Sequence, residues 1–185
     1  MSPSDMGATS RGVLGSESGL AEASISARFD HIAVAAPRVR DLLPLWVDTL
    51  GGTFCYGVDN PHAGWRLIRL AFADQPAVEL MEPLAGSRFF DTFFARNPAG
   101  GLHHVTFLVD ELQSTHDHFV SQGFEPFGLR ASDEEWQEFF VHPRLAHGVL
   151  LQLARRKSAM PLGSSHTIED VLSGHGYGGT GVTSP

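Results

Sequence analysis

Apolar and polar positions follow the same order in two separate stretches of the chain. The first, FDHIAVAAPRVRDLLPLWVDTLGGTF, spans Phe29–Phe54, and the second, LHHVTFLVDELQSTHDHFVSQGFEPF, spans Leu102–Phe127. Each begins with alternating apolar residues, at Asp30–Ala36 and at His103–Val109, and this alternation predicts a half-buried strand. The chain therefore contains an internal repeat of one structural unit.

An amphipathic helix follows the first strand in both copies. The predicted helices cover about Val39–Leu50 and Leu112–Gln122. Both end at a glycine, Gly51 or Gly123, as expected where the residue after a helix adopts a left-handed conformation. Strand and helix thus come in the same order in each copy.

Further strands complete each copy. The runs that predict them are Trp65–Phe72 and Ala77–Met81 in the first copy, and Gln137–Val141 and Gly148–Leu153 in the second. Between the copies, SRFFDTFFARN (Ser87–Asn97) predicts a linking helix, and the spacing of its phenylalanines indicates core packing rather than a ligand site.

The pattern as a whole predicts an α+β fold with two tandem βαβββ modules. The modules lie at about 28–86 and 101–156, and the linking helix lies at about 87–97. Side by side, two such modules would form a curved mixed sheet with helices outside. The concave inner face is where a small ligand would bind.

The two ends of the chain have a different composition from this domain. Residues 1–27 and 157–185 are rich in small and polar residues without sustained periodicity, so we expect a flexible arm and a flexible tail. A short helix at Thr167–Ser173 is an alternative within the tail.

Charge and hydropathy narrow the classes of partner. The formal net charge is −8 and Lys and Arg do not cluster, which argues against nucleic acid because phosphate contacts need a basic face. No apolar run has the length of a signal-peptide core or of a membrane span. We therefore expect a cytoplasmic protein with a small-molecule substrate, and a homodimer is a further expectation.

Four residues with metal-binding side chains occupy equivalent points of the two copies. His31 and His104 lie 73 positions apart in the first strands, and Glu79 and Gln152 lie 73 positions apart in the last strands. Their neighbours on the same strand face are mostly small or apolar. A carboxylate in such surroundings needs a partner, and one divalent cation would satisfy all four side chains.

Two nitrogen and two oxygen donors suit Zn²⁺, Co²⁺, Ni²⁺, Mn²⁺ or Fe²⁺. Four protein ligands leave up to two positions of an octahedron for water or substrate, as Lewis-acid catalysis requires. The alternative is that Glu79 and Gln152 point outward and that the histidines are ordinary core residues.

Two further polar residues are candidate substrate contacts. Arg66 and Arg69 fall on opposite faces of one predicted strand, so at most one of them points into the concavity, and Arg69 is the candidate for an anionic substrate. Thr106 shares its strand face with His104 and is the second candidate. His103, by contrast, is expected to face away from the site.

At these residues the sequence resembles the vicinal oxygen chelate superfamily, which includes glyoxalase I, methylmalonyl-CoA epimerase, bleomycin-resistance proteins and extradiol dioxygenases. The likeness is strongest to the methylmalonyl-CoA epimerase branch and covers about Phe29–Arg155. It rests on FDHIAVAAP, on VELMEPL (Val78–Leu84), on AGGLHHVTFLVD (Ala99–Asp110) and on HPRLAHGVLLQL (His142–Leu153).

The resemblance implies the glyoxalase-like fold and makes His31, Glu79, His104 and Gln152 the metal ligands. In this family the metal binds two substrate oxygens and acidifies an adjacent C–H. The expected function is a metal-dependent epimerase or isomerase that acts through a metal-stabilised enolate, on an acyl-CoA or another oxygen-chelating metabolite. Glu79 would then be both a ligand and the catalytic proton carrier.

Two departures keep other reactions open. Gln152 stands where the epimerases resemble GVLIEL, and an amide is no useful base near neutral pH. The strand WRLIRLAF (Trp65–Phe72) also lacks the carboxylate that some epimerases supply there. The alternatives are a glyoxalase I-type lyase, an Fe²⁺ dioxygenase with two histidines and one carboxylate, and a non-catalytic binding protein of the resistance type.

Overall fold

The computed structural model describes residues 25–158 and 166–175, and these form one eight-stranded sheet in the order β2-β3-β4-β1-β5-β8-β7-β6. The strands are β1 (Ala27–Ala35), β2 (Thr53–Asn60), β3 (Trp65–Phe72), β4 (Gln75–Pro83), β5 (Gly101–Val109), β6 (Pro126–Arg130), β7 (Trp136–Val141) and β8 (Leu150–Arg156). The expected flexible arm, up to residue 24, lies outside the described residues.

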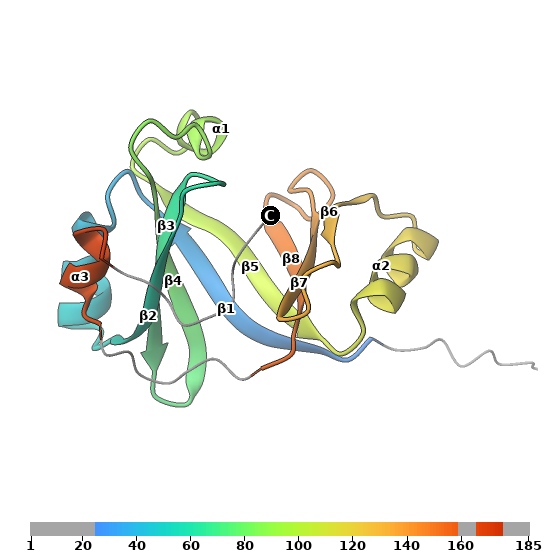
Figure 1. The fold of residues 1–185 in the computed structure, drawn as a ribbon. Coiled ribbons are helices and arrows are strands. Elements are labelled where there is room, and N and C mark those ends of the chain that lie inside the picture. The colour runs from blue at the N-terminus through green and yellow to red at the C-terminus, as the bar shows by residue number, and fades with distance from the viewer. Residues whose placement is uncertain (1–24, 159–165, 176–185) are drawn as a thin grey trace, which may run out of the picture.

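Both predicted modules are present as halves of this sheet. β1 pairs in parallel with β4, β5 pairs in parallel with β8, and the other pairs within each half are antiparallel. Antiparallel pairing of β1 with β5 joins the halves. Figure 1 shows the sheet curving on either side of this central pair, with α2 and α3 on the outer sides. The α+β fold with two βαβββ modules is confirmed, although the sequence pattern did not delimit β2 and β6.

The outer face of each half is covered differently. In the second half, α2 (Leu112–Ser121) is a regular helix whose Leu112 packs on Phe139 and Leu153 of the sheet. In the first half, the helix predicted at Val39–Leu50 is instead a 3-10 turn, η1 (Val39–Asp41), and a π-helix, η2 (Pro44–Thr49). Pro44 has no N–H to donate, so it interrupts the regular hydrogen-bond ladder of an α-helix. The two predicted glycine caps, Gly51 and Gly123, have φ of +75° and +82°.

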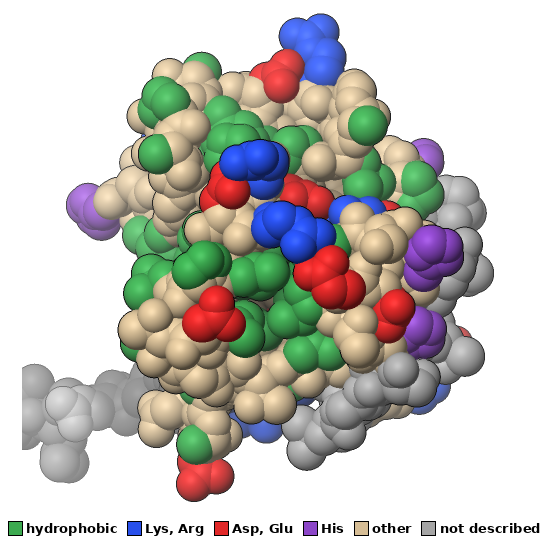
Figure 2. All heavy atoms as spheres, turned by 90° about the vertical axis from the view of Figure 1, so that its left-hand side faces the viewer, with side chains coloured by type: hydrophobic (Ala, Val, Ile, Leu, Met, Phe, Trp, Pro, Cys, Tyr) green, Lys and Arg blue, Asp and Glu red, His purple; other side chains and the backbone are tan. Residues whose placement is uncertain are grey.

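Part of the predicted tail completes the cover of the first half. The helix α3 (Ile168–Leu172) contacts β2, and Val171 is fully buried in the core beside Ile68 and Leu70. A Cβ at Gly57 would come within 2.7 Å of a Val171 methyl group, so only glycine leaves room for the helix there. Figure 2 faces this side of the molecule and shows acidic and basic side chains beside one another among exposed hydrophobic ones. Arg40 of η1 and Glu169 of α3 form an exposed ion pair at 2.9 Å.

The segment that links the halves packs on the concave face of the first half. The predicted helix Ser87–Asn97 is reduced to α1 (Asp91–Phe94), since the Ser87 hydroxyl accepts from the Phe89 amide in a turn and Pro98 disfavours helical backbone at Asn97. Phe90 is buried against Ala33 and Met81, as the phenylalanine spacing predicts, whereas Phe89 is 46% exposed.

No helix in residues 25–158 and 166–175 has the length and apolar character needed to cross a membrane.

Candidate metal centre

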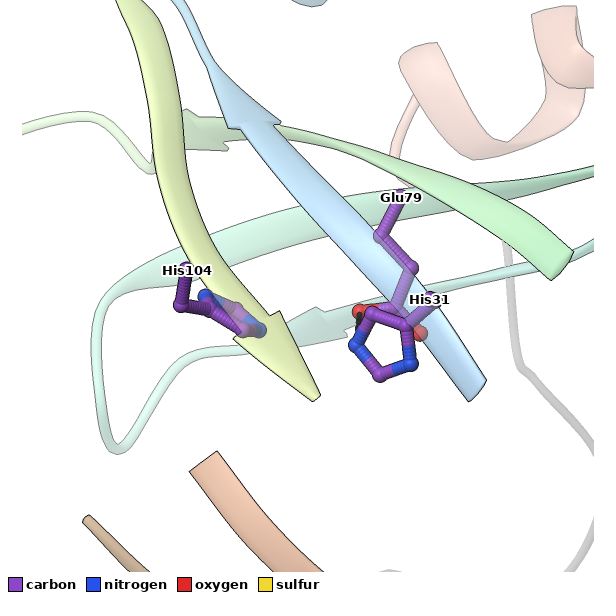
Figure 3. A group of neighbouring side chains, drawn as sticks. All are labelled: His31, Glu79 and His104. Carbon is purple, nitrogen blue, oxygen red and sulfur yellow. Dashed lines mark ion pairs between the residues drawn. The ribbon is translucent and has the colours of Figure 1, made fainter. Parts of the chain in front are cut away.

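Three of the four predicted ligands come together at the middle of the sheet. Ala33 of β1 pairs with Glu79 on one side and with His104 on the other, and His31 lies one pleat away on the same strand face. The nearest donor atoms of His31, Glu79 and His104 all lie within 4.8 Å of one another. Figure 3 shows the three side chains, from β1, β4 and β5, pointing toward a common space. All three are buried.

The two ring nitrogens of His31 have different partners. Nδ1 lies 2.7 Å from Asp30 Oδ2, which as a carboxylate oxygen can only accept a hydrogen bond. Nε2 lies 3.2 Å from Glu79 Oε2 and 3.0 Å from Thr106 Oγ1. A carboxylate on the far nitrogen is the arrangement that fixes the ring of a metal-binding histidine. It leaves Nε2 as the donor atom that faces Glu79.

The two oxygens of Glu79 are divided in the same way. Oε1 accepts a hydrogen bond from Arg69 at 2.9 Å and one from the Tyr56 hydroxyl at 3.3 Å. Oε2 faces His31 Nε2. One oxygen is therefore held by the protein, and the other is turned toward the space between the histidines.

Charge separates the two histidines. Burial by itself would lower the pKa of His31, but the Glu79 charge and the hydrogen bond to Asp30 raise it to about 8. Burial, together with the charge on His31, lowers the pKa of His104 to about 3. Burial would raise the pKa of Glu79, yet His31 and Arg69 hold it well below its usual range. His104 is thus neutral and Glu79 ionised near neutral pH, the states in which both bind metals.

The donor set fits a divalent cation. Two imidazole nitrogens and one carboxylate oxygen meet in a buried space. Asp30 already orients His31, and Arg69 already orients Glu79. In the metal-free chain, the proton on His31 Nε2 lies where the ion would bind. His31, Glu79 and His104 are the residues that would hold it.

Gln152 is placed differently from these three. Its Oε1 accepts a short hydrogen bond, 2.5 Å, from the Thr106 hydroxyl, and its Nε2 donates to Glu138 Oε2 at 2.7 Å. Thr106 therefore lies between His31 and the amide of Gln152. As a fourth ligand, Gln152 remains a prediction.

The candidate substrate contacts are also engaged with the protein. Arg69 does point inward while Arg66 pairs with Asp59 and Glu82, as predicted for opposite faces. Arg69 is buried, however, and donates to Glu79 and to Asp30 at 2.9 Å each. Arg69 therefore holds the Asp30 and Glu79 carboxylates in place. Its role in substrate binding, like that of Thr106, remains a prediction.

Sequence reasoning missed several members of this network. Asp30 and Tyr56 hold His31 and Glu79, and Glu138 binds Gln152, Arg130 and the Trp136 indole N–H. Glu138 lies on the predicted strand Gln137–Val141, so an explicit search of its inward-facing positions would have found it. Tyr56 lies on β2, which the sequence pattern did not delimit and whose pairing is irregular between Phe54 and Tyr56. Asp30 breaks the alternation, and nothing in the sequence pattern indicates this.

The donors lie beneath the surface. Two pockets in the described part of the chain are lined by other residues: one of about 460 Å³ by residues 61–64 and 84–89, and one of about 260 Å³ at the start of α2. The first pocket is related to the centre only through side chains. Phe89 lines this pocket, and the centroid of its ring lies 6.3 Å from that of His103. His31, Glu79 and His104 are each at most 7% exposed, so little of the donor group is open to solvent.

A sheet of two βαβββ halves with a buried histidine and carboxylate group at its centre defines a glyoxalase-like protein. Residues 30–140 match the model of the Glyoxalase/Bleomycin resistance protein/Dioxygenase superfamily, and the chain belongs to this family.

Its relatives are epimerases of acyl-CoA esters. The chain is 26% identical to the ethylmalonyl-CoA/methylmalonyl-CoA epimerase of Cereibacter sphaeroides over 129 residues, which cover 68% of this chain and 96% of that protein. It is 27% identical to the mitochondrial methylmalonyl-CoA epimerase of Mus musculus, over 68% of this chain and 71% of that protein. The fold matches the crystal structure of methylmalonyl-CoA epimerase from Mycobacterium tuberculosis with a TM-score of 0.62 at 24% identity, over 71% and 89% of the two chains.

Proposed function

We propose that this chain is a divalent-metal-dependent enzyme that labilises the α-proton of an acyl-CoA ester, as an epimerase or isomerase. The observation that carries the proposal is the convergence of His31, Glu79 and His104 donor atoms within 4.8 Å. The relatives, named for ethylmalonyl-CoA and methylmalonyl-CoA, supply the substrate class. A bound divalent ion would supply Lewis-acid stabilisation of an enolate oxygen.

The residues around the donors prepare this chemistry. Arg69 and Tyr56 hold one oxygen of Glu79, so the other is oriented without loss of further side-chain entropy on binding. Phe90 and Phe93, with Ala33 and Met81, form an apolar wall on the same face. Because such a wall excludes water, the electrostatic interactions inside the site are stronger.

Glu79 is the proposed proton carrier as well as a ligand, and its surroundings favour the ligand role. A carboxylate whose pKa is held well below its usual range is a weak base. Gln152, at the mirror position of the other half, cannot accept a proton usefully. With one carboxylate of this kind, we expect exchange of the α-proton on one face to be faster than epimerisation, which also requires protonation on the opposite face.

The proposal is tested by incubating the Co²⁺-loaded protein with methylmalonyl-CoA in D₂O and following the α-proton by NMR. We expect exchange with wild type and with Glu125→Gln, a surface control. Exchange should be absent in Glu79→Gln, measured at saturating Co²⁺ with the bound metal counted. No exchange by metal-loaded wild type on malonyl-type CoA esters contradicts the proposal, and exchange by metal-loaded Glu79→Gln removes Glu79 from proton transfer.

One observation favours a second candidate, an Fe²⁺ dioxygenase. The converging donors are two histidines and one carboxylate, the set that non-haem Fe²⁺ oxygenases use, while the amide of Gln152 is bound to Thr106. Oxygen uptake by Fe²⁺-loaded protein with a catechol, absent with Co²⁺, would support this reading. Absence of uptake together with α-proton exchange would decide for the epimerase or isomerase.

A further inference from the structure

The strands β1 and β5 carry two irregularities at positions related by the internal repeat. Between Phe29 and His31 the pairing skips one residue of β1, so Asp30 is the extra residue of a bulge. Between Ala33 and Val34 the partner changes from His104 to Leu102, so His103 is the extra residue of a bulge in β5. Asp30 and His103 lie 73 positions apart, the same offset as His31 and His104.

Each bulge turns its extra residue toward the histidine that follows. In a regular strand, adjacent side chains point to opposite faces, and a bulge is a means of re-aiming one of them. Asp30 Oδ2 lies 2.7 Å from His31 Nδ1, and His103 Nδ1 lies 2.9 Å from His104 Nδ1. The same nitrogen, Nδ1, is therefore held in both histidines.

We propose that Asp30 and His103 are positioning residues that hold Nδ1 of the two ligand histidines and so leave Nε2 of each free for a metal ion. The inference rests on the proposed metal centre but not on the reaction. It predicts that Nδ1 of both rings carries a proton in the folded protein, whatever the substrate, and that the second proton of His31, on Nε2, is the one a metal ion displaces.

Hydrogen-bond chemistry assigns the proton in the first half. His31 Nδ1 lies 2.7 Å from Asp30 and 3.1 Å from the Arg69 guanidinium, which can only donate. The contact with Asp30 is the shorter, so Nδ1 carries the proton and donates it to the carboxylate. Asp30 is itself fixed by Arg69 at 2.9 Å and by Arg156 at 3.3 Å.

In the second half, the positioning residue His103 is held by ring packing instead of by charged groups. The rings of Phe90 and Phe93 each lie 5.1 Å from His103, edge to face. His103 is half-buried among apolar groups, where a neutral ring is favoured. Two nitrogens 2.9 Å apart share one proton, and the proposal assigns it to His104 Nδ1, with His103 Nδ1 as the acceptor, because this leaves His104 Nε2 free for the metal ion.

The pseudo-symmetric bulges thus perform one task with two chemistries. An ionised partner polarises His31 and strengthens it as a donor, whereas a neutral partner orients His104 without that gain. The inference has a consequence that a merely structural bulge lacks, namely a proton fixed on Nδ1 of each ring.

The test is ¹⁵N NMR of the histidine rings in the metal-free protein and in the Zn²⁺-loaded protein. In metal-free wild type we expect a protected, low-field Nδ1–H proton for His31 and the Nδ1–H tautomer for His104. Asp30→Ala should abolish the low-field proton, and His103→Leu should convert His104 to a mixture of tautomers. His103→Gln, which keeps an acceptor, should preserve the wild-type tautomer of His104, and His118→Gln on α2, a half-buried histidine outside this network, should change neither ring.

Zn²⁺ affinity is the second measurement. We expect Asp30→Ala and His103→Leu each to lower it by roughly 10- to 100-fold, the usual cost of removing such a partner. Unchanged ring protonation and affinities within twofold of wild type, in variants that retain the wild-type circular dichroism spectrum, would overturn the proposal. If a variant does not fold, the wild-type tautomers alone decide, because Nε2–H on metal-free His104 contradicts it. The wild-type protein could show this ring protonation and bind Zn²⁺ without exchanging the α-proton. That result would contradict the proposed reaction but not this inference.

Discussion

The two halves of the sheet hold their ligand positions with different side chains: Arg69 and Asp30 contact them in the first half, whereas Thr106, Glu138 and His103 contact them in the second. Glu79 and Gln152 are equivalent by the 73-residue offset, and so are Ala33 and Thr106. Glu79 is held by the Arg69 guanidinium, and Gln152 by the Thr106 hydroxyl and the Glu138 carboxylate. The comparison shows that the repeat preserves backbone positions while the side-chain chemistry at those positions diverges.

The difference extends to the outer faces. The second half is covered by one regular helix, α2, and the first half by two irregular helical turns and by α3 from the far end of the chain. Pro44 explains the irregular turns, and α3 supplies apolar surface that a longer helix would otherwise provide. The part of the site that contains Asp30, Arg69 and Glu79 therefore lies in the half of the sheet that α3 helps to cover.

The largest effect is expected from exchanging the two equivalent ligands. Glu79→Gln should lower Co²⁺ affinity roughly 100-fold or more, because a full negative charge leaves the donor set. The double exchange Glu79→Gln/Gln152→Glu should not restore it. A carboxylate at 152 would face Glu138, whose Oε2 lies 2.7 Å from Gln152 Nε2, and it would lack an arginine like Arg69. Calorimetric titration with Co²⁺ checks this, and wild-type affinity in the double exchange would mean that the two halves are interchangeable.

A second large effect is expected at Arg69. Replacing it by methionine leaves Asp30 and Glu79 buried without their shared cation. Removing one member of such a network costs about 3–5 kcal/mol. Arg38, which is exposed and pairs with Asp41, is the matched control, and Arg38→Met should cost no more than about 1 kcal/mol. Urea unfolding of the metal-free proteins measures both, and equal costs would show that the charged network adds nothing to stability.

The two ligand histidines should respond to pH in opposite directions. His31, with a pKa of about 8, stabilises the folded metal-free protein fully below pH 6.5, and this contribution is lost as pH rises through 8. A shift of this size corresponds to roughly 2 kcal/mol. His104, with a pKa of about 3, stays neutral in the folded protein while the unfolded chain takes up a proton below pH 6.5, so stability falls as the pH falls from there. NMR titration of the two rings, with unfolding measured at pH 5, 6.5 and 8.5, checks this, and coincident titration curves would contradict the charge difference between the halves.

The smallest effect is expected from the tail helix. Val171 is fully buried against Gly57 and against the core residues Ile68 and Leu70. Val171→Ala should therefore destabilise the protein by about 1–2 kcal/mol. Val120, which is 51% exposed on α2, is the control, and Val120→Ala should cost under about 0.5 kcal/mol. Thermal unfolding resolves this difference. Equal melting temperatures for the two variants would mean that α3 contributes little to the cover of the first half.

Periodicity and the repeat offset were sufficient to predict the fold and the convergence of His31, Glu79 and His104. Alternation places side chains on a face, and a constant offset places equivalent residues at equivalent points of paired strands. The partners of these residues could not be predicted in the same way. Asp30 and His103 face the site only because of bulges, and a bulge depends on the pairing of two strands far apart in sequence.

The packing of α3 was likewise beyond the sequence pattern. TIEDVLS predicts a short helix, and the structure adds that Thr167 caps it, with the Thr167 side chain accepting from the Asp170 amide. A helix of this length is marginal by itself, so its position is decided by tertiary contacts with β2. Only the space left by Gly57, seen in three dimensions, indicates where Val171 packs.

The central claim, a metal ion held between the two halves, is tested most directly by elemental analysis of the purified protein beside the double variant His31→Ala/His104→Ala. The account predicts about one divalent transition-metal ion per chain in wild type and none in the double variant. Reconstitution with Co²⁺, Ni²⁺, Mn²⁺, Fe²⁺ and Zn²⁺ guards against loss during purification. A wild-type protein that retains none of these ions, or a double variant that retains as much metal as wild type, would contradict the account.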